Sequence, residues 1–127
     1  GGDGWDSPKL VSLGGESVEG GYFSTHFSKD DPREEVQRFV NEYHARYGQF
    51  PDALAALAYD ACLILFEAIK EAGSIERAAI RNALERTSEL QVLSGRITFD
   101  SQRNPLKSAV IMKIQDGKPV YEKTVTP

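Results

Sequence analysis

Residues 108–125 read SAVIMKIQDGKPVYEKTV, and this stretch has the clearest backbone period in the chain. Val110, Met112 and Ile114 are every second residue, so in an extended strand their large apolar side chains lie on one face. Asp116-Gly117 then separates two strand-like runs, and Asp-Gly in that place favours a tight hairpin turn. The pattern predicts a strand over 108–115 and a C-terminal β-hairpin whose second strand covers 120–125.

Two further runs upstream indicate strands. Residues 19–25 end in YFST at 22–25, whose aromatic and β-branched types favour a strand. Residues 95–99 (GRITF) predict a short strand, and the polar run 100–105 after it predicts a turn.

Four segments carry helix signals. Residues 7–14 place Ser at the N-cap and Pro at the first helical position, and residues 31–47 open with a capping Asp, Pro and acidic residues. Residues 53–72 are apolar nearly all round, so we expect that helix in the interior or beneath another domain. Residues 75–86, capped by Ser74, have a narrower apolar stripe and belong on the surface. The elements together predict an α/β fold.

Composition excludes several classes of protein. The chain has 127 residues, 40% hydrophobic and 27% charged, which suits one globular domain. Its net charge is −4 with no basic patch, so nucleic acid is not an expected partner. The chain has no run of 18 or more apolar residues, and the uncharged apolar stretch 61–66 is too short to span a bilayer. The single Cys62 does not distinguish a reducing from an oxidising compartment, and we expect it to be a buried, inert thiol.

No catalytic or metal-binding pattern is visible in the sequence. His26 and His44 lack partners at metal-ligand spacing, so structural roles are expected for both. The motif G-x-G-x-x-G fails because Ser7 stands where its third Gly would be, which argues against a phosphate-binding loop. The run from Asp100 to Asn104 lacks the spaced acids of a calcium loop and is expected to be an ordinary turn. We therefore expect no enzyme activity, no metal and no cofactor.

The loop Gly2-Asp3-Gly4-Trp5-Asp6-Ser7-Pro8 is the most distinctive local feature. Glycines let a backbone approach a ligand closely, and a carboxylate between them can face a cation. Two other interpretations stay open from local chemistry: a tight turn whose Trp5 anchors the core, and paired acids, Asp3 and Asp6, in an enzyme. The second is weak because no other chemical group stands nearby in sequence.

The whole chain resembles the type I periplasmic solute-binding proteins of ABC importers, specifically the branched-chain amino-acid receptors. It is similar to the carboxy-terminal third of such a receptor. The matching segments are Gly1-Gly2-Asp3-Gly4-Trp5-Asp6-Ser7-Pro8, Val18-Glu19-Gly20-Gly21-Tyr22-Phe23, Asp30-Asp31-Pro32, Phe39-Val40-Asn41-Glu42-Tyr43, Tyr47-Gly48, Pro51-Asp52, Ala58-Tyr59-Asp60-Ala61 and Gly95-Arg96-Ile97-Thr98-Phe99-Asp100.

The resemblance implies a partial three-layer, Rossmann-like fold and a site between two lobes. Asp3 matches the acid that pairs with the ligand's α-ammonium, and Gly4 and Trp5 would line the same wall. Leu54 and Tyr59 match a segment that borders the ligand side chain from the other lobe, although a core role is the stronger expectation for both. Residues 1–127 would contribute to both lobes, with the loop, first strand and final hairpin in one and the three longer helices in the other.

The resemblance also implies partners and a location. The partners would be an amino acid, a membrane permease, and either the missing amino-terminal part of the receptor or a swapped dimer. The chain begins without Met or a signal peptide, so we expect a piece of a longer protein that works in the periplasm or outside the cell. The alternative from another class is a standalone flavodoxin-like or receiver-like signalling domain, although the acidic cluster at strand ends that such a domain needs is not visible.

Overall fold

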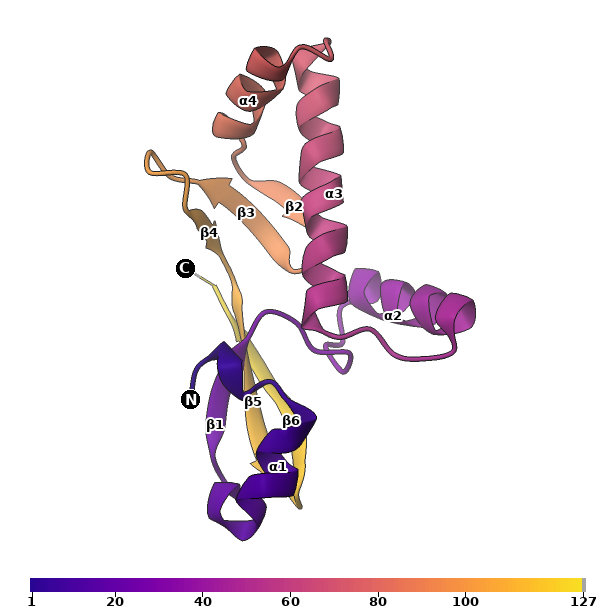
Figure 1. Cartoon of the computed structure of the whole chain (residues 1–127), viewed down its shortest axis with the longest axis vertical. Coiled ribbons are helices and arrows are strands. Elements are labelled where there is room, and N and C mark those ends of the chain that lie inside the picture. Colours follow the sequence, from indigo (N-terminus) through magenta and orange to yellow (C-terminus); the bar gives the residue numbers. More distant parts are fainter. Residues whose placement is uncertain (127) are drawn as a thin grey trace. The chain divides into compact units, whose positions relative to one another are not determined.

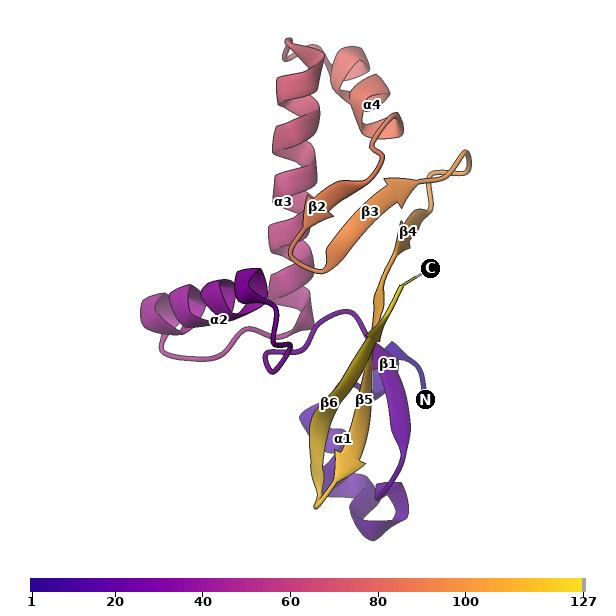
Figure 2. The same cartoon turned by 180° about the vertical axis from the view of Figure 1, so that it is seen from behind.

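The computed structural model describes residues 1–126 and divides them into two compact units (Figures 1 and 2). The first unit comprises Gly1–Ala53 with Ala109–Thr126, and the second comprises Leu54–Ser108. The helices and 3₁₀ turns (η) lie mainly in the first two thirds of the chain, and five of the six strands follow one another in the last third. In chain order the elements are η1 (Asp3–Trp5), α1 (Pro8–Gly14), η2 (Gly15–Val18), β1 (Tyr22–Thr25), α2 (Glu34–Tyr47), α3 (Ala53–Ala72), α4 (Arg77–Glu85), β2 (Leu90–Val92), β3 (Gly95–Phe99), β4 (Pro105–Lys107), β5 (Ala109–Gln115) and β6 (Lys118–Val125).

The first unit is built on an antiparallel sheet with the strand order β1-β5-β6. One face of this sheet buries Phe23, Val110, Met112 and Ile114. The α1 helix covers that face, since Leu10 and Val11 pack against the cluster, with Val18 of η2 beside them (Figure 1). The alternation predicted for β5 is confirmed, because positions 110, 112 and 114 are buried and those between them only partly.

The predicted C-terminal hairpin is confirmed, with Gln115 paired to Lys118 across a two-residue turn. Asp116 has φ 52° and Gly117 has φ 68°, the left-handed values that a type I′ turn requires. The carboxylate of Glu19 accepts hydrogen bonds from the backbone N–H of Asp116 at 2.9 Å and of Gly117 at 3.0 Å. The turn is therefore held by an acid almost a hundred residues earlier.

The α2 helix begins later than its sequence predicts. Asp31 was expected to cap it, but the helix starts at Glu34 and the Asp31 carboxylate is buried at 1% exposure. That carboxylate accepts from the backbone N–H of Arg33 at 3.0 Å and from its guanidinium Nη2 at 2.8 Å. The hydrogen bond with Asp31, which outweighs desolvation, raises the pKa of the Arg33 guanidinium above its ordinary value. The pair closes the loop before α2, and the helix starts two residues later than predicted.

The first unit also contains α2, whereas the three longer helices were expected together in the other lobe. The cause lies in the loop after β1. The Gln37 side-chain amide donates to the carbonyls of Asp31 at 2.7 Å and Lys29 at 2.8 Å, and the Phe27 and Phe39 rings meet edge to face at 6.1 Å. The helix is thereby bound to the segment that leaves β1.

Aromatic rings continue along α2. Val36 and Val40 of its predicted stripe are buried, and the Tyr43 ring lies 5.8 Å from that of Phe39 and 4.6 Å from that of Tyr47. Tyr47, at the end of the stripe, is 57% exposed, so the buried part of the helix face ends before it.

The second unit is a three-stranded antiparallel sheet in the order β2-β3-β4, with α3 beside it (Figure 2). Ile64 of α3 forms a buried cluster with Val92 and Ile97, and Leu84 of α4 packs against it. The sequence predicted β3 but neither three-residue neighbour, and it assigned Pro105 to the turn rather than to β4. Strands of three residues are too short for a period of two to appear.

The α3 helix has apolar side chains on nearly every side, but this unit buries only one of its faces. Its buried residues are Ala56, Asp60, Ile64 and Ala68, which share one face. A three-stranded sheet covers only that face, so the opposite face is open to solvent. Cys62 is exposed, which corrects the expectation of a buried thiol.

The α4 helix and the turn after β3 behave largely as their sequences predict. α4 buries Ala83 and begins at Arg77 rather than Ile75, because the Ser74 hydroxyl accepts from the Glu76 N–H in a turn before the helix.

In the turn after β3, the Asp100 carboxylate accepts from the backbone N–H groups of Gln102 and Asn104, both at 2.8 Å. These bonds, the one from Asn104 first, lower the pKa of Asp100. The polar run is an ordinary turn, as expected.

Candidate functional site

The glycine-rich loop at the start of the chain forms the 3₁₀ turn η1 and leads directly into α1. The Trp5 N–H donates to the Gly2 carbonyl at 3.0 Å, and the Asp6 N–H donates to the Asp3 carbonyl at 2.9 Å. Ser7 is the N-cap of α1, and its hydroxyl accepts from the Lys9 N–H at 3.2 Å. The loop therefore has its own internal hydrogen bonds, and the acid at its tip is held on a defined backbone.

The Trp5 ring packs on glycines rather than in the core. A Cβ added at Gly1 would lie 2.3 Å from Trp5 Cδ2, and one added at Gly21 would lie 3.7 Å from Cζ3 and 2.9 Å from the Val18 carbonyl oxygen. The ring is 39% exposed. Trp5 thus combines a packing contact with an open face, and the expectation of a fully core-anchoring Trp is only partly met.

The loop lies along β1 through three polar contacts. The Ser24 N–H donates to the Gly1 carbonyl at 3.1 Å, and the Gly1 amino group donates to the Tyr22 carbonyl at 2.6 Å. The buried Thr25 hydroxyl donates to Asp6 Oδ2 at 2.6 Å. Asp6 therefore joins the loop to the strand, whereas the Asp3 carboxylate lies beside His26.

Asp3 is the loop carboxylate that is exposed to solvent. Its side chain is 70% exposed, and its Oδ2 lies 3.4 Å from Nε2 of His26, whose side chain is 41% exposed. His26 directly follows β1, so the same strand that binds Asp6 brings the imidazole to Asp3. The arrangement offers an accessible carboxylate with an imidazole beside it, and such a carboxylate suits binding of a cationic group.

The other predicted site residues separate into two sets. Gly4 stays within η1, and a Cβ at this position would meet no atom within 4 Å, so the chain's own packing does not demand glycine there. Leu54 and Tyr59 lie on α3 in the second unit and are 75% and 45% exposed. Their expected core role is wrong within this chain, because both point away from the face that α3 presents to its sheet.

At this loop, sequence reasoning assigned His26 a structural role and did not single out Thr25. They stand some twenty positions from Asp3 and Asp6 and share no motif with them. Neither residue was recognisable alone. The only signal was the combination of a polar pair at the end of a strand with two acids in the loop that precedes that strand.

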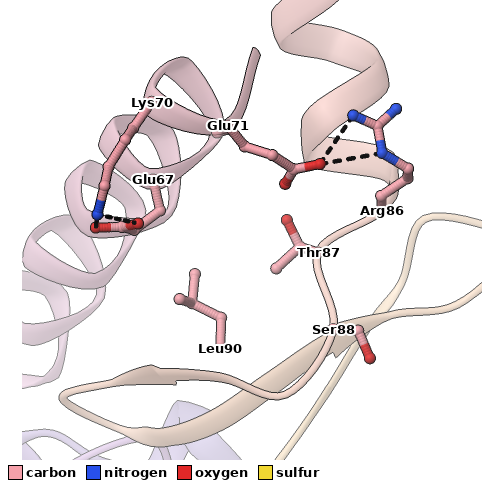
Figure 3. A pocket seen from close by; sticks show the side chains of 8 residues that line it. Glu67, Lys70, Glu71, Arg86, Thr87, Ser88 and Leu90 are labelled. Carbon is pink, nitrogen blue, oxygen red and sulfur yellow. Dashed lines mark hydrogen bonds and ion pairs between the residues drawn. The ribbon is translucent and has the colours of Figure 1, made fainter. Parts of the chain in front are cut away.

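A pocket of about 450 Å³ lies in the second unit, between α3 and the segment from α4 to β2 (Figure 3). Its charged side chains pair with one another, Lys70 with Glu67 at 3.3 Å and Arg86 with Glu71 at 2.8 Å. All four are at least 50% exposed. The charged side chains of this pocket are therefore already paired with one another and exposed to solvent.

Residues 1–126 contain neither a metal-binding cluster nor a helix that could cross a membrane. Their His, Cys, Asp and Glu side chains include no group of three or more placed to hold a metal ion. None of the described helices combines the length and the apolar character needed to cross a membrane.

Residues 2–118 match the family model described as "Periplasmic binding protein". The chain belongs to the periplasmic binding protein family. This assignment confirms the resemblance seen in the sequence and the partial type I fold, and it replaces the flavodoxin-like or receiver-like alternative. The family is a class of solute-binding proteins rather than of enzymes.

Solved structures of family members agree with the assignment. A leucine binding protein from Thermotoga maritima is 38% identical, with a TM-score of 0.82 over 99% of this chain and 36% of that one. A putative branched-chain amino acid ABC transporter protein from Rhodospirillum rubrum is 31% identical, with a TM-score of 0.82 over 96% of this chain and 36% of that one.

A third solved structure contains a bound amino acid. The branched-chain amino acid transporter substrate binding protein LivJ from Streptococcus pneumoniae, in complex with isoleucine, is 29% identical, with a TM-score of 0.82 over 100% of this chain and 36% of that one. The chain thus spans just over a third of the length of the solved structures that it matches.

Proposed function

We propose that residues 1–127 are the carboxy-terminal part of an ABC-importer receptor that binds a branched-chain or related amino acid between two lobes. The proposal rests on one observation above all: Asp3 is a 70% exposed carboxylate on a hydrogen-bonded glycine loop. Similarity to leucine- and isoleucine-binding proteins supports the ligand class. Binding occurs without chemical conversion, and lobe closure presents the ligand to a membrane permease outside the cytoplasm.

Asp3 binds the α-ammonium of the ligand. A carboxylate facing an ammonium forms a charge-assisted hydrogen bond, roughly twice as strong as a neutral one. Gly4 and Trp5 form the wall beside it: Gly4 has open space where a side chain would stand, and Trp5 has an open ring face. Leu54 and Tyr59, which are exposed on α3, border the ligand side chain from the other lobe.

The remainder of the receptor, or a second copy by domain swapping, completes the site. The groups that bind the ligand carboxylate would come from that part. The exposed apolar face of α3 supports this assembly, because contiguous apolar surface of that kind marks an interaction site.

The substitution Asp3→Asn tests the ligand role. In the full-length receptor, we expect it to weaken leucine affinity at least tenfold, or about 1.4 kcal/mol, because the ammonium loses its anionic partner. Isothermal titration calorimetry measures the change.

Glu122→Gln is the matched control, since it removes the same charge from an exposed position on β6 of the same unit. We expect the control to bind leucine like the wild type. An Asp3→Asn receptor with unchanged affinity would remove Asp3 from the site.

A further inference from the structure

His26 stands beside the carboxylate that the proposed function assigns to the ligand. Its Nε2 lies 3.4 Å from Asp3 Oδ2, and the two side chains are 41% and 70% exposed. Hydrogen bonds fix the position of His26 relative to Asp3, because the strand that precedes His26 is bonded to the loop on both sides of Asp3. Ser24 N–H binds the Gly1 carbonyl, and Thr25 Oγ1 binds Asp6 Oδ2.

The charged groups of the loop and of the segment that follows β1 have distinct partners. Asp3 and Asp6 come from the loop, and Asp6 accepts from Thr25 at 2.6 Å. The Gly1 amino group donates to the Tyr22 carbonyl. Beyond β1, Lys29 pairs with Asp30 at 2.7 Å, and Arg33 pairs with Asp31 at 2.8 Å. Asp3 is the carboxylate that remains for the imidazole.

We propose that His26 is a positioning residue for Asp3 that makes amino-acid capture weaken in acid. Neutral imidazole leaves the charge of Asp3 available for the ligand ammonium. Protonated imidazole forms an ion pair with Asp3 and places a second positive charge beside the incoming ammonium. Both effects act in the same direction, so the ligand must displace an ion pair and overcome repulsion from a like charge. Histidine is the side chain that changes charge between about pH 5 and 8.

The inference rests on the proposed role of Asp3 and adds a pH dependence of ligand affinity, which that role alone does not require. Leucine keeps its ammonium and carboxylate charges across that pH range, so the ligand itself contributes no such dependence. Because both side chains are well exposed, the effect should match that of exposed ion pairs, roughly a two- to fivefold loss of affinity.

The test measures the leucine dissociation constant of the full-length receptor between about pH 8 and pH 5. We compare the wild type with His26→Gln, whose amide cannot take up a proton. The wild type should lose roughly two- to fivefold in affinity on acidification. His26→Gln should bind leucine at pH 8 and keep that affinity as the pH falls, a difference that a merely structural role would not produce.

His44→Gln is the matched control. His44 lies on α2 with its ring stacked on Phe50, at 4.5 Å between ring centroids, and we expect this variant to show the wild-type pH profile. If the wild-type affinity does not change with pH, or if His26→Gln loses affinity as steeply as the wild type, the inference is overturned alone. Leucine that fails to bind the wild type at any pH contradicts the proposed function, and this inference with it.

Discussion

Asp60 illustrates how one buried acid organises the second unit. Its side chain comes from α3 and is only 4% exposed. Oδ1 accepts from the Leu93 N–H at 2.7 Å, and Oδ2 accepts from the Ser94 N–H at 3.1 Å. The carboxylate therefore satisfies both backbone donors of the turn between β2 and β3, which fixes that hairpin to the helix.

Asp60→Ala should destabilise the chain by about 3 kcal/mol, because two buried N–H groups lose an ionised acceptor. Asp60→Asn should cost less, since its amide oxygen can still accept from one of them. Urea unfolding followed by circular dichroism measures both. The exposed Glu85→Ala in the same unit is the control, and a loss for Asp60→Ala no greater than for Glu85→Ala would contradict the role of Asp60.

Lys107 presents the opposite case, a buried ammonium without a hydrogen-bond partner in the described part of the chain. Burial lowers the pKa of Lys107 below 10.5, and the charge of Asp60 only partly opposes the shift. With a folded pKa below the unfolded one, the unfolded chain binds more protons between the two values. The free energy of unfolding therefore rises with pH in that window, and the ammonium is a cost at neutral pH.

Lys107→Met should raise the free energy of unfolding by about 1 kcal/mol at pH 7, because it removes that desolvated charge. The gain should shrink as the pH rises above 10.5, where the wild-type amine becomes neutral in both the folded and the unfolded state. Denaturant unfolding at the two pH values measures the difference. Lys123→Met, at an exposed position of β6, should show no such gain, and a Lys107→Met chain that is less stable at pH 7 would refute this account.

At the scale of elements, the β5–β6 hairpin depends on a residue outside it. Glu19→Ala removes the acceptor for both turn N–H groups, so we expect a loss of about 1 kcal/mol in unfolding free energy. Hydrogen exchange at Asp116 and Gly117 should accelerate as well. Glu16→Ala, on η2, is the control, and equal exchange rates in the two variants would show that Glu19 does not hold the turn.

For the whole molecule, the exposed apolar face of α3 predicts association. It is formed by residues at helical spacing, and its large members include Leu54 at 75%, Leu65 at 41% and Phe66 at 63% exposure. This chain alone should self-associate, and Leu65→Lys with Phe66→Glu should shift it towards monomer. Native mass spectrometry over a range of concentrations measures the populations.

The control for this prediction is Ile75→Glu, at a site that is 85% exposed but lies between α3 and α4, off that face. It should associate like the wild type. Equal monomer populations in the wild type and the double variant would contradict an interface on α3.

The sequence by itself determined the elements whose signals are local. The period of two in β5, Asp-Gly at the hairpin turn, and Ser7 with Pro8 at the start of α1 each act over a few residues, so each could be predicted. The loop around Asp3 was distinctive for the same reason, since an acid between glycines is visible without knowledge of the fold.

Only the tertiary structure decided what depends on residues far apart in the chain. Asp31 turns to Arg33 and delays α2, α3 buries one face because three strands cover only that face, and Cys62 is exposed. His26 reaches Asp3 because β1 is bonded along the loop. Local propensity contains no term for such pairings; they arise when buried polar groups must find partners and apolar faces must be covered, and both conditions are set by the packed molecule.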